Sequence, residues 1–317
     1  MCKLLRKLFG KDKPDPPAPP TPPTPEPETD ILAGGAKFGV SFFDIEHAAI
    51  PNQMQNDLWW LADCGLTIAR CFINFDWFHF RDIDNDHKVT LDSQGNIDTQ
   101  KLDLLHIFID KCAQKGLIAD VSFISHPLHI TDEWVLRGDY DSGTGILGII
   151  KAINEWGYTN VIFDPANEHH EISQAMCTQL ATDIKNIAGD KYYYGISVAN
   201  NASPEQACDQ QIRIESCNMV RYHNPRVASF YTDVVDLGNR LLSCAGGRPC
   251  YFDEPIKAGW GNIYPTADQW VTYFTHLKNL GIHGILHTEA GFVMHKQSFR
   301  SQLRPEEKQA IEKIGKL

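Results

Sequence analysis

The chain has 317 residues, of which 43% are hydrophobic and 22% are charged. This length suits one large globular domain with an appendage better than two full domains. The longest apolar runs, such as the one around Ile146 to Ile153, are far shorter than the roughly 20 residues that span a bilayer, which excludes a transmembrane protein. A net charge of -11 repels phosphate backbones, and no basic face appears in the sequence, which argues against nucleic-acid binding.

The N-terminal region has a composition unlike the rest of the chain. Residues 14–27 hold nine of the 18 prolines, which predicts an extended spacer. We expect residues 1–13 to form a basic amphipathic peptide, residues 14–35 a Pro-rich linker and residues 36–317 the folded domain. The peptide is either a disordered solubilising tail or a segment that docks to a partner protein or a membrane surface.

This peptide is too short and too charged to read as a cleavable signal. We therefore expect synthesis in the cytoplasm, with release from the cell or display on a particle as routes to an external target.

Nine cysteines are an odd number, and they are scattered along the chain. This pattern predicts buried thiols more than a disulfide framework. Cys244 and Cys250 flank a Gly-Gly-Arg-Pro turn and are the candidate pair. No CxxC motif occurs, so the sequence does not support a zinc ribbon.

Beyond the linker, short apolar runs rich in β-branched and aromatic residues alternate with longer amphipathic stretches, which is typical of a βαβα organisation. The predicted strands are 37–43, 67–73, 117–123, 160–166, 192–198, 217–222, 249–253 and 283–287. The predicted helices are 51–64, 98–115, 145–156, 173–188, 230–244, 267–280 and 305–314.

Glycines follow several predicted helices where a left-handed cap is expected, at Gly65, Gly116, Gly157, Gly189 and Gly281. Eight strands in residues 36–317 predict an α/β fold of the (β/α)8 TIM-barrel type, preceded by the Pro-rich extended segment. A doubly wound open sheet is the alternative, but no GxGxxG or P-loop motif follows the first strand.

In a TIM barrel the active site lies at the carboxyl ends of the strands. The residues at these ends are almost all polar. They are Asp44, Arg70, Asn74, Ser125, His126, Asn167, Glu168, Asn200, Asn201, Tyr222, His223, Asp253, Glu254, His287 and Glu289.

Two glutamates in this set end strands four and seven, which face each other across a barrel of eight strands. Paired carboxylates are what glycoside hydrolysis needs, because one protonates the leaving oxygen while the other attacks or stabilises the anomeric carbon. A carboxyl separation of about 5 Å gives retention, whereas roughly 6.5 to 9.5 Å leaves room for water and gives inversion.

At these positions the sequence resembles the clan A glycoside hydrolases, the retaining (β/α)8 β-glycosidases that include cellulases and mannanases. The resemblance covers residues 36–317. It implies that Glu168, which follows Asn167 on strand four, is the acid/base, and that Glu254 on strand seven is the nucleophile. It implies a function in cleaving a β-glycosidic bond of an oligo- or polysaccharide.

The resemblance also implies that Arg70 contacts the nucleophile and that Tyr222 or His223 fills the strand-six position. The tryptophan that the clan has at the end of strand eight is missing, because Leu286-His287-Thr288-Glu289 stands there. For the nucleophile, a buried arginine would lower the pKa of the neighbouring carboxyl. For the acid/base, we expect apolar surroundings that raise the pKa of Glu168.

Sugar sites need flat apolar surfaces on which a pyranose stacks. Trp260, in the loop after strand seven, is the best candidate, followed by Trp77, Trp134 and Tyr264. We expect Trp59 and Trp60, which lie mid-helix, to be core residues.

Asn167 is expected to donate to the substrate 2-hydroxyl. Support of the substrate is also expected from His126, at the end of strand three. Asp253 and Glu289 are expected to support neighbouring groups or to be structural.

Two other functions remain open at the level of sequence. Thirteen histidines, several at strand ends, allow a metal-dependent barrel hydrolase or isomerase, although neither HExxH nor HxH after strand one occurs. A non-catalytic sugar-binding or structural barrel in a cell-surface or phage assembly is the third class. The two-glutamate mechanism requires neither a metal nor a cofactor, and the predicted ligand is a carbohydrate substrate.

Overall fold

The structure is a computed structural model of the chain that describes residues 30–42, 51–73, 91–123, 132–168, 172–198, 202–288 and 298–317. The predicted N-terminal peptide, most of the predicted linker, and the candidates His126, Trp77 and Glu289 lie outside these residues. Among the described residues, no helix is both long enough and apolar enough to cross a bilayer.

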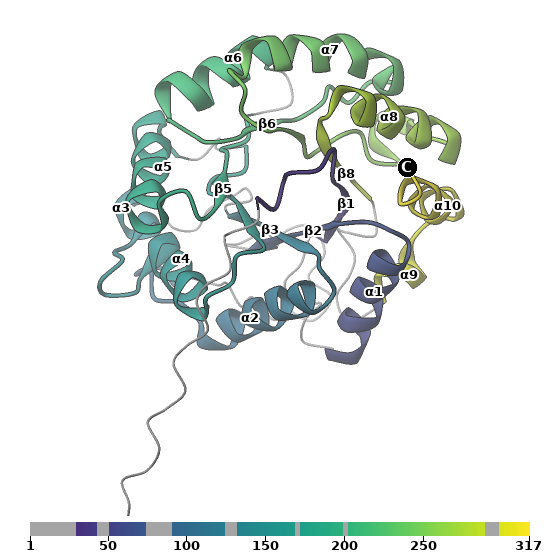
Figure 1. The fold of residues 1–317 in the computed structure, drawn as a ribbon. Helices are drawn as coiled ribbons and strands as arrows, with labels where there is room; N and C mark the ends of the chain where they lie inside the picture. The colour runs from purple at the N-terminus through teal and green to yellow at the C-terminus, as the bar shows by residue number, and fades with distance from the viewer. Residues whose placement is uncertain are drawn as a thin grey trace, which may run out of the picture.

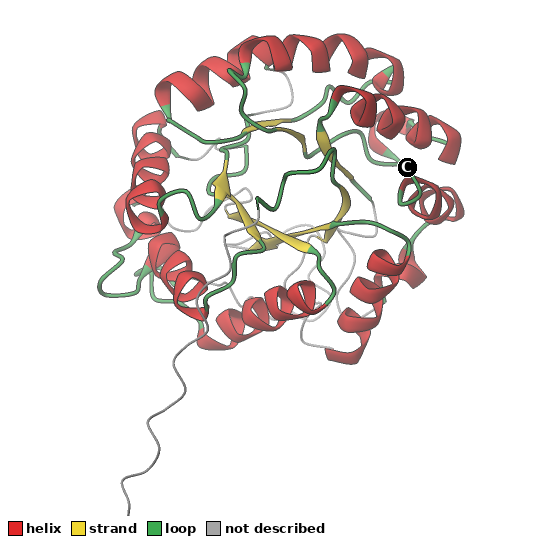
Figure 2. Ribbon diagram, viewed as in Figure 1, coloured by secondary structure: helices red, strands yellow, loops and turns green. Residues whose placement is uncertain are grey.

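Eight parallel strands form a ring that helices surround (Figure 1; Figure 2). Their order is β5-β4-β3-β2-β1-β8-β7-β6, and the open seam between β5 and β6 is bridged where the Met219 N–H donates to the Tyr194 carbonyl oxygen at 3.3 Å. The predicted TIM barrel is confirmed, and the doubly wound alternative is wrong. The strands are β1 (Phe38–Phe42), β2 (Ile68–Ile73), β3 (Ile118–Phe123), β4 (Val161–Asp164), β5 (Tyr193–Tyr194), β6 (Val220–Tyr222), β7 (Cys250–Phe252) and β8 (His283–Leu286).

All seven predicted helices are present, with ends within one residue of the predicted bounds. They are α1 (Pro51–Asp63), α2 (Thr99–Gln114), α4 (Gly145–Trp156), α5 (Gln174–Ala188), α7 (Phe230–Cys244), α8 (Ala267–Leu280) and α10 (Pro305–Ile314). The predicted glycines end their helices with positive φ, as at Gly157 (80°) and Gly281 (71°), where a side chain would be strained. The structure adds α3 (Glu133–Arg137), α6 (Pro204–Cys208), η2 (Asp209–Ile214), η3 (Trp260–Asn262) and α9 (Phe299–Gln302), which are too short to show a periodic pattern.

The side chains inside the barrel form layers, because every second residue of a strand points to the same face. The layer at the amino ends of the strands is apolar and consists of Ile68, Ile118, Ile162, Met219, Tyr251 and Ile285. Leu32, from the end of the predicted linker, packs against this layer, and Asp30 beside it accepts a hydrogen bond from the Tyr193 hydroxyl at 2.9 Å. The segment just before β1 therefore contributes to the core.

Two residues further along five of these strands, the interior becomes charged. This buried ionic layer consists of Arg70, Asp120, Asp164, Arg221 and Asp253, all with 0% exposure. Charged groups are almost never buried unless they are paired, so the layer must be closely ion-paired. It forms the floor on which the strand-end residues rest.

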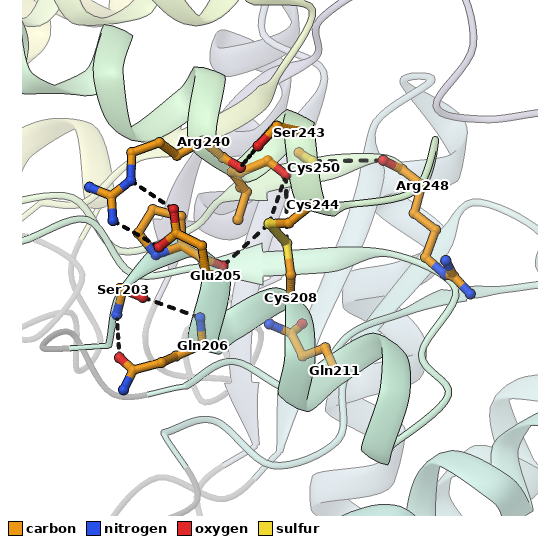
Figure 3. The surroundings of a disulfide bond; sticks show 12 residues. Ser203, Glu205, Gln206, Cys208, Gln211, Arg240, Ser243, Cys244, Arg248 and Cys250 are labelled. Carbon is orange, nitrogen blue, oxygen red and sulfur yellow. Dashed lines mark hydrogen bonds and ion pairs between the residues drawn. A yellow bond between two sulfur atoms is a disulfide. The ribbon is translucent and has the colours of Figure 1, made fainter.

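One disulfide joins two outer helices of the described part of the chain. Cys208 at the end of α6 is bonded to Cys244 at the end of α7 (Figure 3). The sequence-based pairing of Cys244 with Cys250 is wrong, because the Cys250 thiol is free and buried on β7, with its S–H directed to the Arg248 carbonyl oxygen. The remaining described cysteines are free thiols, mostly buried, as the sequence predicted.

Candidate active site

Two glutamates and a histidine meet above the buried ionic layer. Glu168 follows β4, His223 follows β6 and Glu254 follows β7. One carboxylate oxygen of each glutamate and one ring nitrogen of His223 all lie within 4.8 Å of one another. The expected convergence of the two strand-end glutamates is present. The Glu254 side chain is 5% exposed and that of Glu168 is 21% exposed, so Glu168 is the more accessible of the two.

Arg70 on β2 holds Glu254 from below. Its Nη1 donates to Glu254 Oε1 at 3.1 Å and to the Asp253 carbonyl oxygen at 3.0 Å. Its Nη2 donates to Asn167 Oδ1 at 2.8 Å and to Asp164 Oδ2 at 3.1 Å. One guanidinium thus connects the ends of strands four and seven, and it places a positive charge against Glu254, as the sequence predicted.

His223 lies between the two glutamates. Its Nδ1 is 3.0 Å from Glu168 Oε1 and 3.8 Å from Glu254 Oε2, and its Nε2 is 3.2 Å from Asp253 Oδ1. Burial alone would lower the pKa of His223, but the facing carboxylates of Glu254, Asp253 and Glu168 outweigh burial and raise it to about 9. The ring is therefore an imidazolium at neutral pH, and its Nδ1–H donates to Glu168.

The backbone at Glu168 adopts a left-handed conformation, with φ of 55°. This region is uncommon for residues other than glycine and costs conformational energy, and such residues cluster at functional sites. The Glu168 N–H donates to Ser197 Oγ at 3.3 Å, and the one hydroxyl hydrogen of Ser197 is shared between Asp164 Oδ2 at 2.7 Å and Asn167 Oδ1 at 3.0 Å. These contacts fix the backbone of Glu168, whose Oε1 lies 3.0 Å from His223 Nδ1.

A second arginine, which sequence reasoning missed, contacts both glutamates. Arg226, on the segment after β6, donates from Nη2 to Glu254 Oε2 at 2.8 Å and lies 3.6 Å from Glu168 Oε1. Its guanidinium also sits 4.6 Å from the centre of the Trp260 ring. Apolar surroundings were expected for Glu168, and this expectation is wrong, since its neighbours are the cations of His223 and Arg226.

Arg221 is the second cation of the buried ionic layer. It forms two parallel bonds to Asp120, at 2.9 and 2.7 Å, and a third to Asp253 Oδ2 at 2.6 Å. Burial would lower the pKa of Arg221, but the charges of Asp120, Asp164 and Asp253 raise it well above its ordinary value. For Asp253, burial is outweighed by His223, Arg221 and Arg70, which lower its pKa, so Asp253 is the anion that supports the imidazolium.

No family model matches the sequence, and neither does any curated protein. Solved structures do match the fold. A family 5 glycoside hydrolase from Prevotella bryantii B14, in complex with a xyloglucan tetradecasaccharide, is 11% identical with a TM-score of 0.58, covering 83% of this chain and 85% of that one. A Bifidobacterium longum enzyme of subfamily 18 of that family, in complex with Manβ1-4GlcNAc, is 13% identical with a TM-score of 0.60, covering 89% and 78%.

An endo-1,4-β-D-mannanase from Thermotoga petrophila RKU-1 is 12% identical with a TM-score of 0.55, covering 89% of this chain and 99% of that one. The chain has the fold of the family 5 glycoside hydrolases. The resemblance to clan A that the sequence indicated is thereby confirmed at the level of the fold.

Other predicted residues lie apart from the two glutamates of this family 5 fold. Tyr222 is buried on the opposite face of β6, where its ring packs near Phe252 and its hydroxyl donates to the Ala202 carbonyl oxygen at 3.2 Å. Of the two candidates on strand six, the structure brings only His223 to the carboxylates. Trp134 is 64% exposed on α3, whereas Trp59 and Trp60 pack partly buried against the core, as expected.

The end of β8 carries a histidine where clan A has a tryptophan. His287 is 1% exposed, and burial, together with the nearby cations of Arg226, Lys257 and Arg70, lowers its pKa well below the ordinary value. It therefore contributes a neutral imidazole to the site.

Glu168, His223 and Glu254 are the one group among the described residues that is spaced to hold a metal ion. The groups around them do not suit one. Both oxygens of Glu254 already accept from guanidinium groups, at 3.1 Å from Arg70 and 2.8 Å from Arg226, and His223 carries a proton. A divalent cation would have to displace or repel these charges, because a histidine ligand must be neutral.

Proposed function

We propose that the chain is a glycoside hydrolase that cleaves a β-glycosidic bond in an oligo- or polysaccharide with retention of configuration. The observation that carries this proposal is the approach of Glu168 and Glu254. One carboxylate oxygen of Glu168 lies within 4.8 Å of one carboxylate oxygen of Glu254. That spacing fits the separation of about 5 to 5.5 Å typical of retaining enzymes better than the wider gap of inverting ones. The likeness to family 5 barrels supports the same reaction class.

Glu254 is the proposed nucleophile. Arg70 and Arg226 each bind one of its oxygens, which stabilises the carboxylate and fixes its orientation. In the first step one oxygen of Glu254 attacks the anomeric carbon, the bond from that carbon to the leaving oxygen breaks, and the leaving oxygen takes a proton from Glu168. The product is a covalent glycosyl-enzyme.

Glu168 is the proposed acid/base, and His223 supplies its proton. The two side chains share one proton across a 3.0 Å hydrogen bond, so movement from Nδ1 to Oε1 converts the ion pair into a neutral imidazole and a carboxylic acid. Exclusion of water by the substrate favours this neutral pair, because burial disfavours charged forms. In the second step Glu168 removes a proton from water, which attacks the anomeric carbon and releases Glu254.

Asn167 is the proposed contact for the substrate 2-hydroxyl. Its Oδ1 accepts hydrogen bonds from Arg70 and Ser197, so its Nδ2 is the end that can donate to a sugar. Trp260, 45% exposed in the loop after β7, is the proposed stacking surface.

Labelling with activated 2-fluoro-glycosides of several sugars, followed by peptide mapping, tests the proposal. The fluorine slows release of the glycosyl-enzyme, so we expect a glycosyl mass on the peptide that contains Glu254 and no label in Glu254→Gln. Glu168→Gln should hydrolyse substrates poorly yet still accept label from a glycoside with a good leaving group. Absence of label with every sugar, or a label on another residue, would overturn the assignment.

A further inference from the structure

A pocket of about 380 Å³ opens at the loop after β7. It is lined by Lys257, Ala258, Gly259, Trp260 and Tyr264 from the loop after β7 and by Arg304 at the start of α10. α10 packs along α8 on the outside of the barrel (Figure 1), and Arg304, the residue just before α10, reaches this loop. The volume lies within the range of small-ligand sites.

Two aromatic rings give the pocket surfaces on which a sugar can stack. Trp260 is 45% exposed and Tyr264 is 58% exposed. Apart from Trp134, they are the only strongly exposed aromatic side chains among the described residues, and both line this one pocket. Exposed aromatic groups gathered in a concave site indicate ligand binding more than chance exposure.

Cations surround both rings. The Arg304 guanidinium lies 4.8 Å from the centre of the Tyr264 ring, and the Lys257 ammonium lies 5.8 Å from that of Trp260. Arg304 also approaches Glu306, but only at 3.6 Å and at the surface, and its buried Nη1 makes no hydrogen bond within the described residues. In a chain of net charge -11, this concentration of positive charge is local to the pocket.

The pocket is joined to the reacting groups through Arg226. This arginine stacks on the Trp260 ring at 4.6 Å and binds Glu254 at 2.8 Å. One side chain therefore separates Trp260 from Glu254. Arg226 itself binds Glu254, and Lys257 and Arg304 are the cations that line the pocket.

We propose that this pocket is a subsite for a sugar residue that carries an anionic group, a uronic acid or a sulfated or phosphorylated pyranose. The position of this subsite along the substrate rests on the proposed function. The binding of an anionic sugar to the pocket does not. A neutral sugar needs the rings and gains little from the cations, whereas an anionic one forms charge-assisted hydrogen bonds with both. The substrate is thus an acidic glycan, and the subsite selects it.

Binding of free monosaccharides tests the subsite without any turnover, because a free sugar has no glycosidic bond to cleave. The probes are D-glucuronate, D-glucose 6-sulfate, D-glucose 6-phosphate and D-glucose. The readout is the indole N–H signal of Trp260 in a two-dimensional ¹H–¹⁵N spectrum of the full chain, assigned with Trp260→Phe. We expect at least one anionic sugar to bind about tenfold more tightly than glucose, and this preference to fall with added salt.

Arg304→Gln and Lys257→Gln should each reduce the preference for anionic sugars severalfold and leave glucose binding unchanged. Two variants are used because a folding defect in one of them then does not decide the outcome. Arg300→Gln is the matched control, because Arg300 makes a similar contact with Trp60, at 5.0 Å, away from this pocket. Equal affinity for glucose and all three anionic sugars, or an unchanged preference in both variants, would overturn the subsite. Failure of 2-fluoro-glycoside labelling with intact anion-selective binding would instead overturn the hydrolase and leave the subsite standing.

Discussion

Glu215, between η2 and β6, is a buried acid whose effect on stability can be measured without knowledge of the substrate. It is fully buried, and its Oε1 accepts from Nε2 of Gln174 at 2.7 Å and of Gln210 at 3.1 Å. Burial raises the pKa of Glu215 from 4.5 to about 7, although the two amides partly offset this effect. Between these two pH values the folded protein holds a proton that the unfolded chain has lost, so wild-type stability falls as pH rises through this window.

Replacement by glutamine removes the ionisation and keeps both accepted hydrogen bonds, because the amide oxygen can take the place of Oε1. The gap between 4.5 and about 7, at about 1.4 kcal/mol per pKa unit, corresponds to about 3 kcal/mol. We therefore expect Glu215→Gln to be close to wild type in free energy of unfolding at pH 4 and about 3 kcal/mol more stable at pH 8.

Denaturant unfolding of both proteins at pH 4, 6 and 8 measures this difference. Glu312→Gln, at an exposed position on α10, is the control and should show no such rise. A variant that is equally stabilised at pH 4 and pH 8, or destabilised at pH 8, would refute the reasoning.

Three further perturbations test the site and its support. His223→Gln should move the alkaline limb of the kcat/KM profile from about pH 9 to lower pH, because the proton shared with Glu168 is then held by the carboxyl alone; an unmoved limb would exclude His223 as the proton store. Arg221→Met should lower the free energy of unfolding by about 3 to 5 kcal/mol, since it removes the cation closest to the buried Asp120 and Asp253, whereas Arg213→Met at the surface should change little. Cys208→Ser should cost up to about 4 kcal/mol, the loop-closure value for a separation of 36 residues, in a denaturation experiment without reductant; no loss would show that the disulfide does not constrain the unfolded chain.

The barrel was predictable because its local signals agree with one another. Apolar runs, amphipathic helices and glycines past the helix ends all indicate the same alternation, and the structure follows it.

The shortest strand shows where that reasoning stops. Residues 192–198 read as a strand, but only Tyr193–Tyr194 pair as one, since the Tyr194 N–H donates to Asn218 Oδ1 and the Ser197 N–H to Asp164 Oδ1. Side-chain acceptors there take the backbone N–H groups that a longer strand would pair with a neighbouring strand. Strand propensity does not predict hydrogen bonds of this kind.

The two glutamates were predictable because both stand directly at strand ends. Arg70 and His223, which contact them, also followed from the resemblance, whereas Asp120, Arg221 and Arg226 were not predicted, since they come from the middle of strands or from a loop. Asp120 and Arg221 interrupt apolar runs at alternate positions, and a charge inside a buried strand was itself a signal that the interior holds an ion-pair network. Arg226 gave no such signal, because its place over Glu254 depends on how the segment after β6 turns.

The buried ionic layer holds two nearby carboxylates beside different cations. Arg70 binds Glu254 on one side and Asn167 and Asp164 on the other, so it links the end of strand seven to the segment that carries Glu168. Asp253 holds Arg221 and His223 at once, which keeps the imidazolium pointed at Glu168. Both oxygens of Glu254 accept hydrogen bonds from guanidinium groups. Glu168 instead faces the imidazolium of His223, which can transfer its proton. The roles proposed for the two glutamates fit the cation that each carboxylate faces, since a guanidinium does not release its proton and an imidazolium does.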